Sequence, residues 1–390
     1  MQTQCSAEQL EFSCVERRRV VAAFDGGRVT SDAGALLLKR TDEAIRLIDR
    51  LAGCFVDYRD AGTVEHSVRA LVAQRVFGIA LGYEDLNDHE TLRHDPVFGV
   101  LIGKLTARRS RCAALAGKST LNRLELHPSS RISRYHKIMP RGEAIERLWV
   151  EQFLNAHREA PQQIVLDLDA TDDPLHGHQE GRFFHGFYDH YCYLPLYIFC
   201  GEHLLCAKLR RSNIDASAGA LEEIERIVGL IRERWAATRI ILRADSGFAR
   251  EELMSWCESH DIHYVFGLAR NARLQRAIGA ELHEAALESR RTQQPARRFK
   301  ELTYATRRSW SRRRRVVGKA EHTGDKSNPR FVVTSLSIKA IAARELYEQL
   351  YCARGEMENR IKEAQLDLFA DLQELQPDRV RTGSRERRTS

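Results

Sequence analysis

The sequence has no apolar run long enough to span a bilayer. A membrane helix needs about 20 predominantly apolar residues, and the 390 residues contain no such run. The first residues are polar and charged and lack the apolar core of a signal peptide. We therefore expect a soluble cytoplasmic protein with no membrane partner.

Paired cysteines are also missing. The chain has nine cysteines, an odd number, and no two of them are spaced as Cys-x-x-Cys. This pattern argues against a disulfide framework and against a structural zinc site. Cys192, Cys200 and Cys206 fall in an apolar stretch, where cysteine usually behaves as a small buried hydrophobic residue. The sequence thus favours a reducing compartment.

Acidic residues are fewer than basic ones. The chain has 61 Lys and Arg residues against 54 Asp and Glu residues, which gives a formal net charge of +7. A positive balance favours a polyanionic partner such as nucleic acid, without proving one.

The spacing of apolar residues divides the chain into a helical part and a mixed part. Residues 1–158 are expected to be mainly helical, with clear helices over 68–80 and 142–156. Pro140 and Pro161 bracket the second of these helices and mark a domain edge. Strands begin after this edge, so residues 159–270 are expected to form the first part of a core sheet.

The mixed part alternates strands and helices. Strands are expected at 164–169, 240–245 and 262–268, a hairpin at 193–209, and helices at 217–235, with Asp215 or Ser217 as its cap, and at 249–258. Residues 271–337 are rich in arginine and predict an inserted β-rich subdomain. Residues 338–370 should form the last helix of the core, and residues 371–390 should form a disordered basic tail. The expected fold class is α/β, a mixed sheet flanked by helices.

Two aspartates end strand-like runs. Asp169 closes the run that begins at Ile164, and Asp245 closes the run that begins at Ile240. Ligand sites in open α/β sheets lie at the carboxyl ends of strands, so adjacent strands would bring both carboxylates to one spot. Glu358 lies at the border of the buried face of the last helix. These three residues are candidate ligands of divalent metal ions for phosphoryl transfer.

Each aspartate taken alone has a simpler interpretation. An aspartate at a strand end often serves as a turn residue or a helix cap, and for either one alone we favour that interpretation. Asp167 also competes with Asp169, because residues i and i+2 on a strand point to the same face.

The densest basic patch is formed by Arg312, Arg313, Arg314 and Arg315. A solvated surface is the alternative interpretation of such a run. We favour contact with DNA phosphate, because the guanidinium group matches phosphate geometry and backbone contacts dominate DNA affinity. Histidines are frequent between positions 176 and 190, but their spacing fits no zinc pattern, so solvated or DNA-facing side chains are expected there.

Several segments resemble the insertion-sequence DDE transposases that carry a Tyr-x2-Arg-x3-Glu-x6-Lys signature. Tyr351, Arg354 and Glu358 match its first three positions in residue type and spacing. The fourth position is Gln365, and Lys362 one turn earlier is a candidate substitute. The segments 24–32, 168–172, 181–186, 243–248 and 358–363 also resemble that family, and the resemblance extends to about Phe369.

The resemblance implies an RNase H-like core, dependence on Mg2+ with Mn2+ as a substitute, and cleavage and strand transfer at insertion-sequence ends. Asp169, Asp245 and Glu358 would be the catalytic and metal-binding residues. Tyr351, Arg354 and Lys362 would contact DNA, and the helical region 1–158 would bind it. The implied partners are double-stranded DNA with terminal inverted repeats, target DNA and a second copy of the chain in a homodimer on DNA. The implied location is the bacterial cytoplasm, associated with the nucleoid.

The sequence departs from that family after the helix that carries the glutamate. Family members usually continue into further apolar helical sequence, whereas residues from Asp371 onward are polar and rich in arginine. On that basis we expect a truncated or frameshifted copy that binds DNA but transfers strands weakly or not at all. Two alternatives stay open: a catalytically defective DNA-binding remnant, and a metal-dependent nuclease with the same core.

Overall fold

A computed structural model of the chain describes residues 10–15, 18–22, 30–126, 133–175, 177, 181–324 and 326–363, with the backbone alone for residues 10–22. The chain divides into two compact units, one within residues 1–142 and one within residues 143–367, and each is described by itself. The expected tail at 371–390 and the signature position Gln365 lie outside the described residues. Within the described ranges, no helix is long and apolar enough to cross a membrane.

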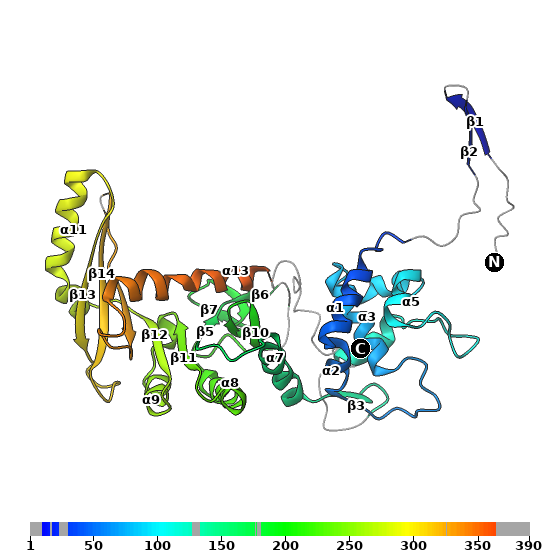
Figure 1. Ribbon diagram of the computed structural model, residues 1–390, viewed down its shortest axis with the longest axis horizontal. Coiled ribbons are helices and arrows are strands. Elements are labelled where there is room, and N and C mark those ends of the chain that lie inside the picture. The colour runs from blue at the N-terminus through cyan, green and yellow to red at the C-terminus, as the bar shows by residue number, and fades with distance from the viewer. Residues whose placement is uncertain are drawn as a thin grey trace, which may run out of the picture. The chain divides into compact units, whose positions relative to one another are not determined.

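The first unit is mainly helical, as its periodicity predicts (Figure 1). Its elements are β1 (Leu10–Val15), β2 (Arg18–Ala22), α1 (Ala35–Ile45), α2 (Leu47–Ala52), β3 (Phe55–Asp57), α3 (Val68–Ala80), η1 (Leu86–Asp88), α4 (His89–Leu92), α5 (Pro96–Ile102), α6 (Lys118–Glu125) and β4 (Ile138–Pro140). Helix α3 begins where expected because the Ser67 hydroxyl accepts a hydrogen bond from the Ala70 amide. Leu71 and Phe77 of this helix are buried in the core of the unit beside Phe98 of α5.

The second unit is built on one large mixed sheet. Its strands are β5 (Gln163–Ala170), β9 (Leu196–Cys200), β10 (His203–Lys208), β11 (Arg239–Ala244), β12 (His263–Leu268), β13 (Ala296–Tyr304), β14 (Arg314–Thr323), β15 (Lys326–Ser327) and β16 (Arg330–Thr334). They are ordered β10-β9-β5-β11-β12-β16-β14-β13, and β15 pairs with β14. Strand β11 runs parallel to β5 and β12, and the other neighbours are antiparallel. The predicted fold class, an α/β mixed sheet flanked by helices, is confirmed.

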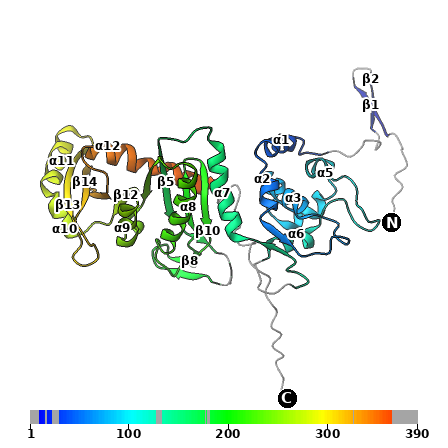
Figure 2. The same ribbon diagram turned by 60° about the horizontal axis from the view of Figure 1, so that its bottom comes forward.

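The sheet is covered on both faces (Figure 1, Figure 2). Helices α7 (Gly142–Ala156), α8 (Ala220–Arg234) and α9 (Glu251–Ser259) pack on the face that carries Ile164, Leu166 and Leu168 of β5. Because side chains alternate along a strand, Val165, Asp167 and Asp169 belong to the other face. That face receives the segment that carries Glu358.

The segment with Glu358 is helical from Ala343 to Glu363 but changes its winding. It consists of α12 (Ala343–Glu345), a π-helical turn η3 (Leu346–Tyr351), a 3-10 turn η4 (Cys352–Arg354) and α13 (Gly355–Glu363). Leu346 packs over the middle of the sheet, and Met357 and Ile361 pack on Tyr197 and Phe199 of β9. The helix predicted within residues 338–370 thus begins at Ala343 and continues to Glu363, the last described residue, and it crosses the sheet from β16 to β9.

The insertion at 271–337 differs from its prediction in two respects. Its strands β13, β14 and β16 extend the central sheet, because β16 pairs directly with β12. It also contains α10 (Ala272–Ala277) and α11 (Gly279–Thr292), which the sequence reading missed. Helix α11 buries only Ala285 and Ser289 fully, so its sequence shows little apolar periodicity.

The N-terminal cap predicted for the helix after residue 217 is also wrong. Helix α8 begins at Ala220 after Gly219, which has a φ of 74°, and no side chain caps it. Asp215 instead accepts hydrogen bonds from the amide and hydroxyl of Ser217 and pairs with Arg250 at 2.7 Å. These contacts form a turn before the helix.

Candidate active site

The site is built on two adjacent parallel strands. In the register of β5 and β11, Asp167 lies directly beside Arg243. Asp169 and Asp245 each come two residues later, so all four side chains belong to the sheet face that carries the glutamate helix. The shared register explains why two aspartates from distant parts of the sequence come together at the carboxyl ends of these strands.

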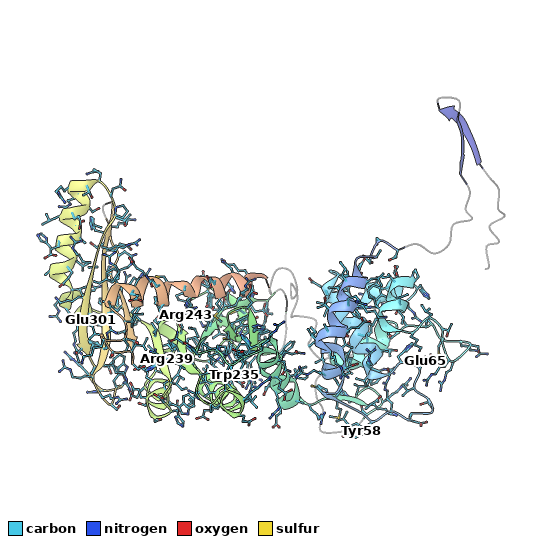
Figure 3. All side chains as sticks on the ribbon, viewed as in Figure 1. Tyr58, Glu65, Trp235, Arg239, Arg243 and Glu301 are labelled. Carbon is cyan, nitrogen blue, oxygen red and sulfur yellow. The ribbon has the colours of Figure 1, made fainter. Side chains whose placement is uncertain are left out.

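Asp167 and Arg243 form a buried ion pair below the two strand-end aspartates. Arg243 donates from Nε and Nη2 to the two Asp167 carboxylate oxygens at 2.5 and 2.7 Å. Its remaining nitrogen, Nη1, donates to the carbonyl oxygen of Leu350 at 2.6 Å, within the π-helical turn. Burial raises the pKa of Asp167, and the Arg243 guanidinium opposes that shift. Arg243 therefore joins β5, β11 and the glutamate helix, and Figure 3 labels it in the second unit.

Arg354 links the carboxylates of Asp169 and Glu358. Its Nη2 donates to Glu358 Oε1 at 2.6 Å, and its Nη1 lies 3.5 Å from Asp169 Oδ1. Burial raises the pKa of Asp169 to about 6, Arg354 opposes the shift, and the charges of Asp245 and Glu358 add to it. Asp245 and Glu358 thus both act electrostatically on Asp169, and the Arg354 guanidinium contacts Asp169 and Glu358.

Asp245 has two roles. Its Oδ1 accepts a hydrogen bond from the Gly247 amide at 2.8 Å and caps the short helix η2 (Ser246–Phe248). The simple interpretation of this residue as a cap is therefore confirmed. The same side chain also contributes to the negative potential at Asp169, so the cap interpretation does not exclude a place in the site.

The Tyr351 side chain packs against the sheet in a space that Gly267 leaves open. A Cβ atom at Gly267 of β12 would lie 2.6 Å from the Tyr351 hydroxyl oxygen and 2.9 Å from the Ser246 amide nitrogen. Only glycine leaves this space. Burial raises the pKa of Tyr351, Arg354 opposes that shift, and Asp245 adds to it. The first residue of the signature is thereby packed beside the second aspartate.

The donors fit a hard divalent cation, but the described geometry is not that of a metal cage. Among the described residues, no group of three or more His, Cys, Asp or Glu side chains is placed to hold a metal ion. Asp169 and Glu358 are instead both contacted by Arg354. Carboxylate oxygens are the ligands that Mg2+ and Mn2+ prefer. A cation would also neutralise the charge that raises the pKa of Asp169.

Lys362 and the first two arginines of the basic run are exposed. Lys362 lies one turn beyond Glu358 on α13. Arg312 has a side chain that is 56% exposed and pairs with Glu258 of α9. Arg313 is exposed and donates to the Thr303 carbonyl at 3.3 Å.

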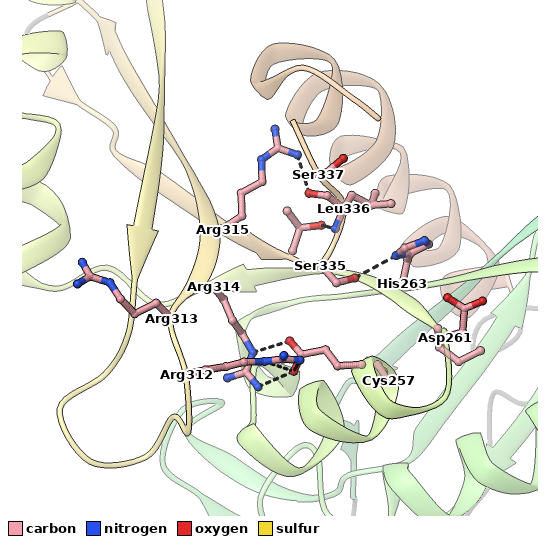
Figure 4. Close-up of a pocket in the computed structure, with 13 residues that line it drawn as sticks. Cys257, Asp261, His263, Arg312, Arg313, Arg314, Arg315, Ser335, Leu336 and Ser337 are labelled. Carbon is pink, nitrogen blue, oxygen red and sulfur yellow. Dashed lines mark hydrogen bonds and ion pairs between the residues drawn. The ribbon is translucent and has the colours of Figure 1, made fainter. Parts of the chain in front are cut away.

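Arg314 and Arg315 have structural partners inside the protein. The Arg314 side chain is 2% exposed and pairs with Glu251 and Glu258 at 2.6 and 2.7 Å. Arg315 pairs with Glu301 at 2.6 Å and donates to the carbonyl of Leu336. Figure 4 shows these arginines around a cavity of about 410 Å3. That cavity borders the start of β12, which is the opposite end of the parallel strands from the aspartates.

Because Arg314 and Arg315 are paired inside the protein, only Arg312 and Arg313 of the run remain candidates for contact with DNA phosphate. Replacing both by alanine should weaken DNA binding similarly for all sequences and make it less dependent on salt, by roughly one unit of log-log slope for each lost phosphate contact. Replacing Arg314 should instead cost about 1–3 kcal/mol of stability, because the partly buried Glu251 and Glu258 lose the charge-assisted hydrogen bonds of a guanidinium that is 2% exposed. Urea unfolding and binding titrations over a range of NaCl concentrations measure the two effects. An unchanged salt slope for the Arg312 and Arg313 variant would leave the run with a structural role alone.

Sequence reasoning missed Arg243, although the sequence contained a signal for it. Arg243 interrupts an apolar run two residues before Asp245, as Asp167 does two residues before Asp169. Charges inside buried strands need partners, and the matching offsets indicate that these two are each other's partner.

Sequence reasoning also missed Tyr188. Its hydroxyl donates to the carbonyl of Ala170, next to Asp169, at 3.3 Å. Burial raises the pKa of Tyr188 to about 12, and the charges of Asp172, Asp169 and Asp245 add to this shift. This tyrosine therefore lies beside the site, although no spacing in the sequence connects it with the carboxylates.

A comparison with family models agrees with the resemblance seen in the sequence. The model of a family described as transposase DDE domain group 1 matches residues 12–378. Among solved structures, the chain is similar to the piggyBac transposase in a synaptic complex with hairpin DNA. The identity is 12% and the TM-score 0.41, over 85% of this chain and 68% of that one. No curated protein matches the chain.

Proposed function

Because the chain belongs to the transposase DDE domain family, we propose that it cleaves DNA at the ends of an insertion sequence and joins the freed ends to target DNA. One observation carries this proposal. Asp169, Asp245 and Glu358 come from three distant parts of the sequence, yet Arg354 contacts both Asp169 and Glu358, and the charges of Asp245 and Glu358 both raise the pKa of Asp169. The cap formed by Asp245 does not by itself explain why its charge lies close enough to raise the pKa of Asp169.

The topology of the core supports the same proposal. The order β10-β9-β5-β11-β12, with β9 antiparallel and β11 and β12 parallel to β5, is the arrangement expected of an RNase H-like core. Asp169 lies on the middle strand, and Asp245 directly follows the neighbouring strand β11. A helix on the same face can then supply the glutamate.

Phosphoryl transfer requires positioning and the neutralisation of charge. Asp169, Asp245 and Glu358 would hold Mg2+ or Mn2+, which when bound supplies Lewis-acid stabilisation of the reacting oxygens. Arg354 would leave the carboxylates and offer its planar guanidinium to a DNA phosphate. Tyr351, which packs in the space left by Gly267, and the exposed Lys362 would contact the same DNA strand.

The remaining parts of the chain have proposed roles in recognition. We assign the helical region 1–158 to the binding of terminal inverted repeats, and the exposed part of the insertion 271–337 to contacts with the DNA backbone. Residues 159–270 and 338–370 form the proposed catalytic core. Two ends must be cut and joined, so the proposed partners are double-stranded DNA, target DNA and a second copy of the chain.

A cleavage assay tests the proposal. The full chain is mixed with labelled DNA from either side of its coding sequence, with Mg2+ or with EDTA. An active copy should give Mg2+-dependent cuts at defined ends and joined products, both abolished by Asp245→Asn and by Glu358→Gln, whereas a truncated copy should bind the ends and give few or no joined products. Asparagine keeps a side-chain oxygen for the Gly247 cap, and Glu345→Gln, an exposed residue of the same helical segment, is the control.

The other outcomes separate the alternatives. Binding to the ends without any cleavage would indicate a defective remnant. Equal cleavage of unrelated DNA without joined products would indicate a nuclease. Cleavage that persists in both carboxylate variants would overturn the assigned site.

A further inference from the structure

A cavity of about 300 Å3 in the first unit gathers basic side chains around an exposed tyrosine. It lies between the segment that follows β3, helix α6 and the segment that precedes β4. Arg123 of α6 lines it, together with Arg134, Tyr135 and Lys137 from the segment before β4. Tyr135 is 54% exposed. We call these four residues the Tyr135 cluster.

The ring of Tyr135 brings two guanidinium groups to one place. The guanidiniums of Arg123 and Arg134 lie 5.9 and 5.8 Å from the centre of the ring. The backbone below the ring is held by Ser133, whose hydroxyl accepts a hydrogen bond from the Tyr135 amide at 3.2 Å. Two side chains from separate segments of the chain are thereby positioned by one ring.

Carboxylates do not neutralise the cations of the Tyr135 cluster. Arg59, on the border of the same cavity, donates from Nε and Nη2 to the two oxygens of Asp57, both at 2.8 Å. In contrast, among the residues that the structure describes, no carboxylate pairs with Arg123, Arg134 or Lys137. A contact between a cation and a ring positions the charge without cancelling it. Because two like charges beside one ring repel each other, an anion bound between them would be stabilised.

The other titratable groups at the cavity leave this excess of positive charge in place. Glu65, which Figure 3 labels, already pairs with Lys104 at 2.6 Å. The Asp60 carboxylate accepts a hydrogen bond from the Gly62 amide at 3.1 Å. Burial lowers the pKa of His66 to about 4, and the charge of Lys104 adds to this shift, so the imidazole is neutral at neutral pH. Three cations of the cluster thus face the single exposed carboxylate of Asp60.

We propose that the Tyr135 cluster binds one backbone phosphate of duplex DNA at the insertion-sequence end and so fixes the register of the first unit on that end. This inference rests on the proposed function. Guanidinium groups match the geometry of a phosphate, and contacts with the backbone set the position of a protein on a duplex without reading its sequence directly. Arg123 and Arg134 make the contact, Lys137 adds charge, and Tyr135 positions the two guanidiniums.

Neutral methylphosphonate linkages test the proposal without catalysis. The probe is a duplex of the insertion-sequence end in which each phosphate in turn is replaced, bound by the full chain in EDTA. We expect one linkage whose replacement weakens binding by the wild type about tenfold, as for one lost charge-assisted hydrogen bond. Arg134→Ala should weaken binding to the unmodified duplex by a similar factor and become insensitive to that linkage. Tyr135→Ala should act in the same direction, whereas Tyr135→Phe, which keeps the ring, should behave as the wild type.

A matched control separates this contact from a general loss of charge. Arg40→Ala removes the same charge from α1, where the Arg40 side chain is 83% exposed and lies 3.9 Å from Glu43. This variant should keep the full dependence on the responsive linkage. Urea unfolding of each variant should match that of the wild type, because the replaced side chains are partly or largely exposed.

The remaining outcomes decide against the inference. If Arg134→Ala binds more weakly but still depends on every linkage as the wild type does, the Tyr135 cluster supports the fold and does not contact a phosphate. Binding of the ends by the wild type with no linkage that couples to Arg123 or Arg134 would overturn the inference and leave the proposed function standing. If the wild type does not bind the ends at all, both are wrong.

Discussion

Replacing Asp167 by asparagine should destabilise the protein, whereas the same change at Asp169 should stabilise it. The two residues are two positions apart on β5 and belong to the same sheet face. Burial raises the pKa of both carboxyls, but only Asp167 has a buried arginine that pairs with no other carboxylate. Asp167 has its own buried arginine, and Asp169 shares one arginine with Glu358 and also faces Asp245.

The loss of stability expected for Asp167→Asn follows from the buried charge of Arg243, which would remain without its partner. The substitution Asp167→Asn would leave the Arg243 guanidinium buried without a counter-charge, and breaking a buried pair from one side costs about 3–5 kcal/mol. Arg243 also holds the Leu350 carbonyl of the π-helical turn. The variant should therefore loosen the glutamate helix as well as lower the free energy of unfolding.

The increase in stability expected for Asp169→Asn follows from the pKa of the Asp169 carboxyl. The carboxyl has a pKa of about 6 in the folded protein against an ordinary value of 3.8. Because the folded pKa is raised, the folded state is favoured by protonation. That contribution is complete below pH 3.8 and is lost as the pH rises through 6. At pH 8 the ionised group costs about 1–3 kcal/mol, and asparagine removes this cost.

Chemical unfolding in EDTA at pH 8 and pH 5 measures both effects. The gain of Asp169→Asn should shrink by about half at pH 5, because the wild-type carboxyl is then largely protonated. The loss in Asp167→Asn should persist at both pH values. If Asp169→Asn destabilises the metal-free protein as Asp167→Asn does, Asp169 is a structural residue and not a strained member of a metal site.

The sequence allowed a site residue to be predicted where its position depends on the pattern of a single strand or helix. Asp169 and Asp245 are recognisable because each ends an apolar run, and Glu358 because helical periodicity places it beside the buried stripe. The exact winding of the glutamate helix was not predictable. Its π-helical turn depends on Arg243 and on the sheet below it, which are tertiary contacts.

Side-chain partners from distant segments could not be predicted from the sequence. The partnership of Asp167 and Arg243 depends on the register of two strands 76 residues apart. The arginine run shows the same limit. Its four members are alike in the sequence, but Arg314 enters a covered strand and meets the glutamates of α9, while Arg315 reaches Glu301 of β13. Burial, which decides between a phosphate contact and an internal ion pair, is a property of the folded sheet.

Replacing Arg354 by glutamine should tighten the binding of Mn2+ and at the same time slow DNA cleavage. Arg354 donates to Glu358 and approaches Asp169, so a cation that binds these carboxylates must displace it. A unit positive charge near 5 Å from a divalent cation costs about 1–2 kcal/mol even at the dielectric constant of water. Its removal should therefore raise the affinity for Mn2+ about tenfold.

The loss of cleavage has a separate origin in the same side chain. Once released from the carboxylates, the Arg354 guanidinium is the group that we assign to a DNA phosphate near the cut, and glutamine carries no charge for that contact. Arg354→Lys keeps the charge without the planar fork. It should leave Mn2+ affinity close to that of the wild type and still slow cleavage.

Calorimetric titration with Mn2+ in the absence of DNA, together with cleavage rates at saturating Mn2+, separates the two effects. Arg360→Gln is the matched control, because it removes the same charge two residues from Glu358 on the same helix, where Arg360 pairs with Glu202 at 3.0 Å. If Arg354→Gln binds Mn2+ as the wild type does, the guanidinium does not compete with the cation, and its role is limited to DNA. If Mn2+ binding becomes weaker, Arg354 instead holds Asp169 and Glu358 in the positions that the cation needs, and the contacts seen without metal are part of the assembled site.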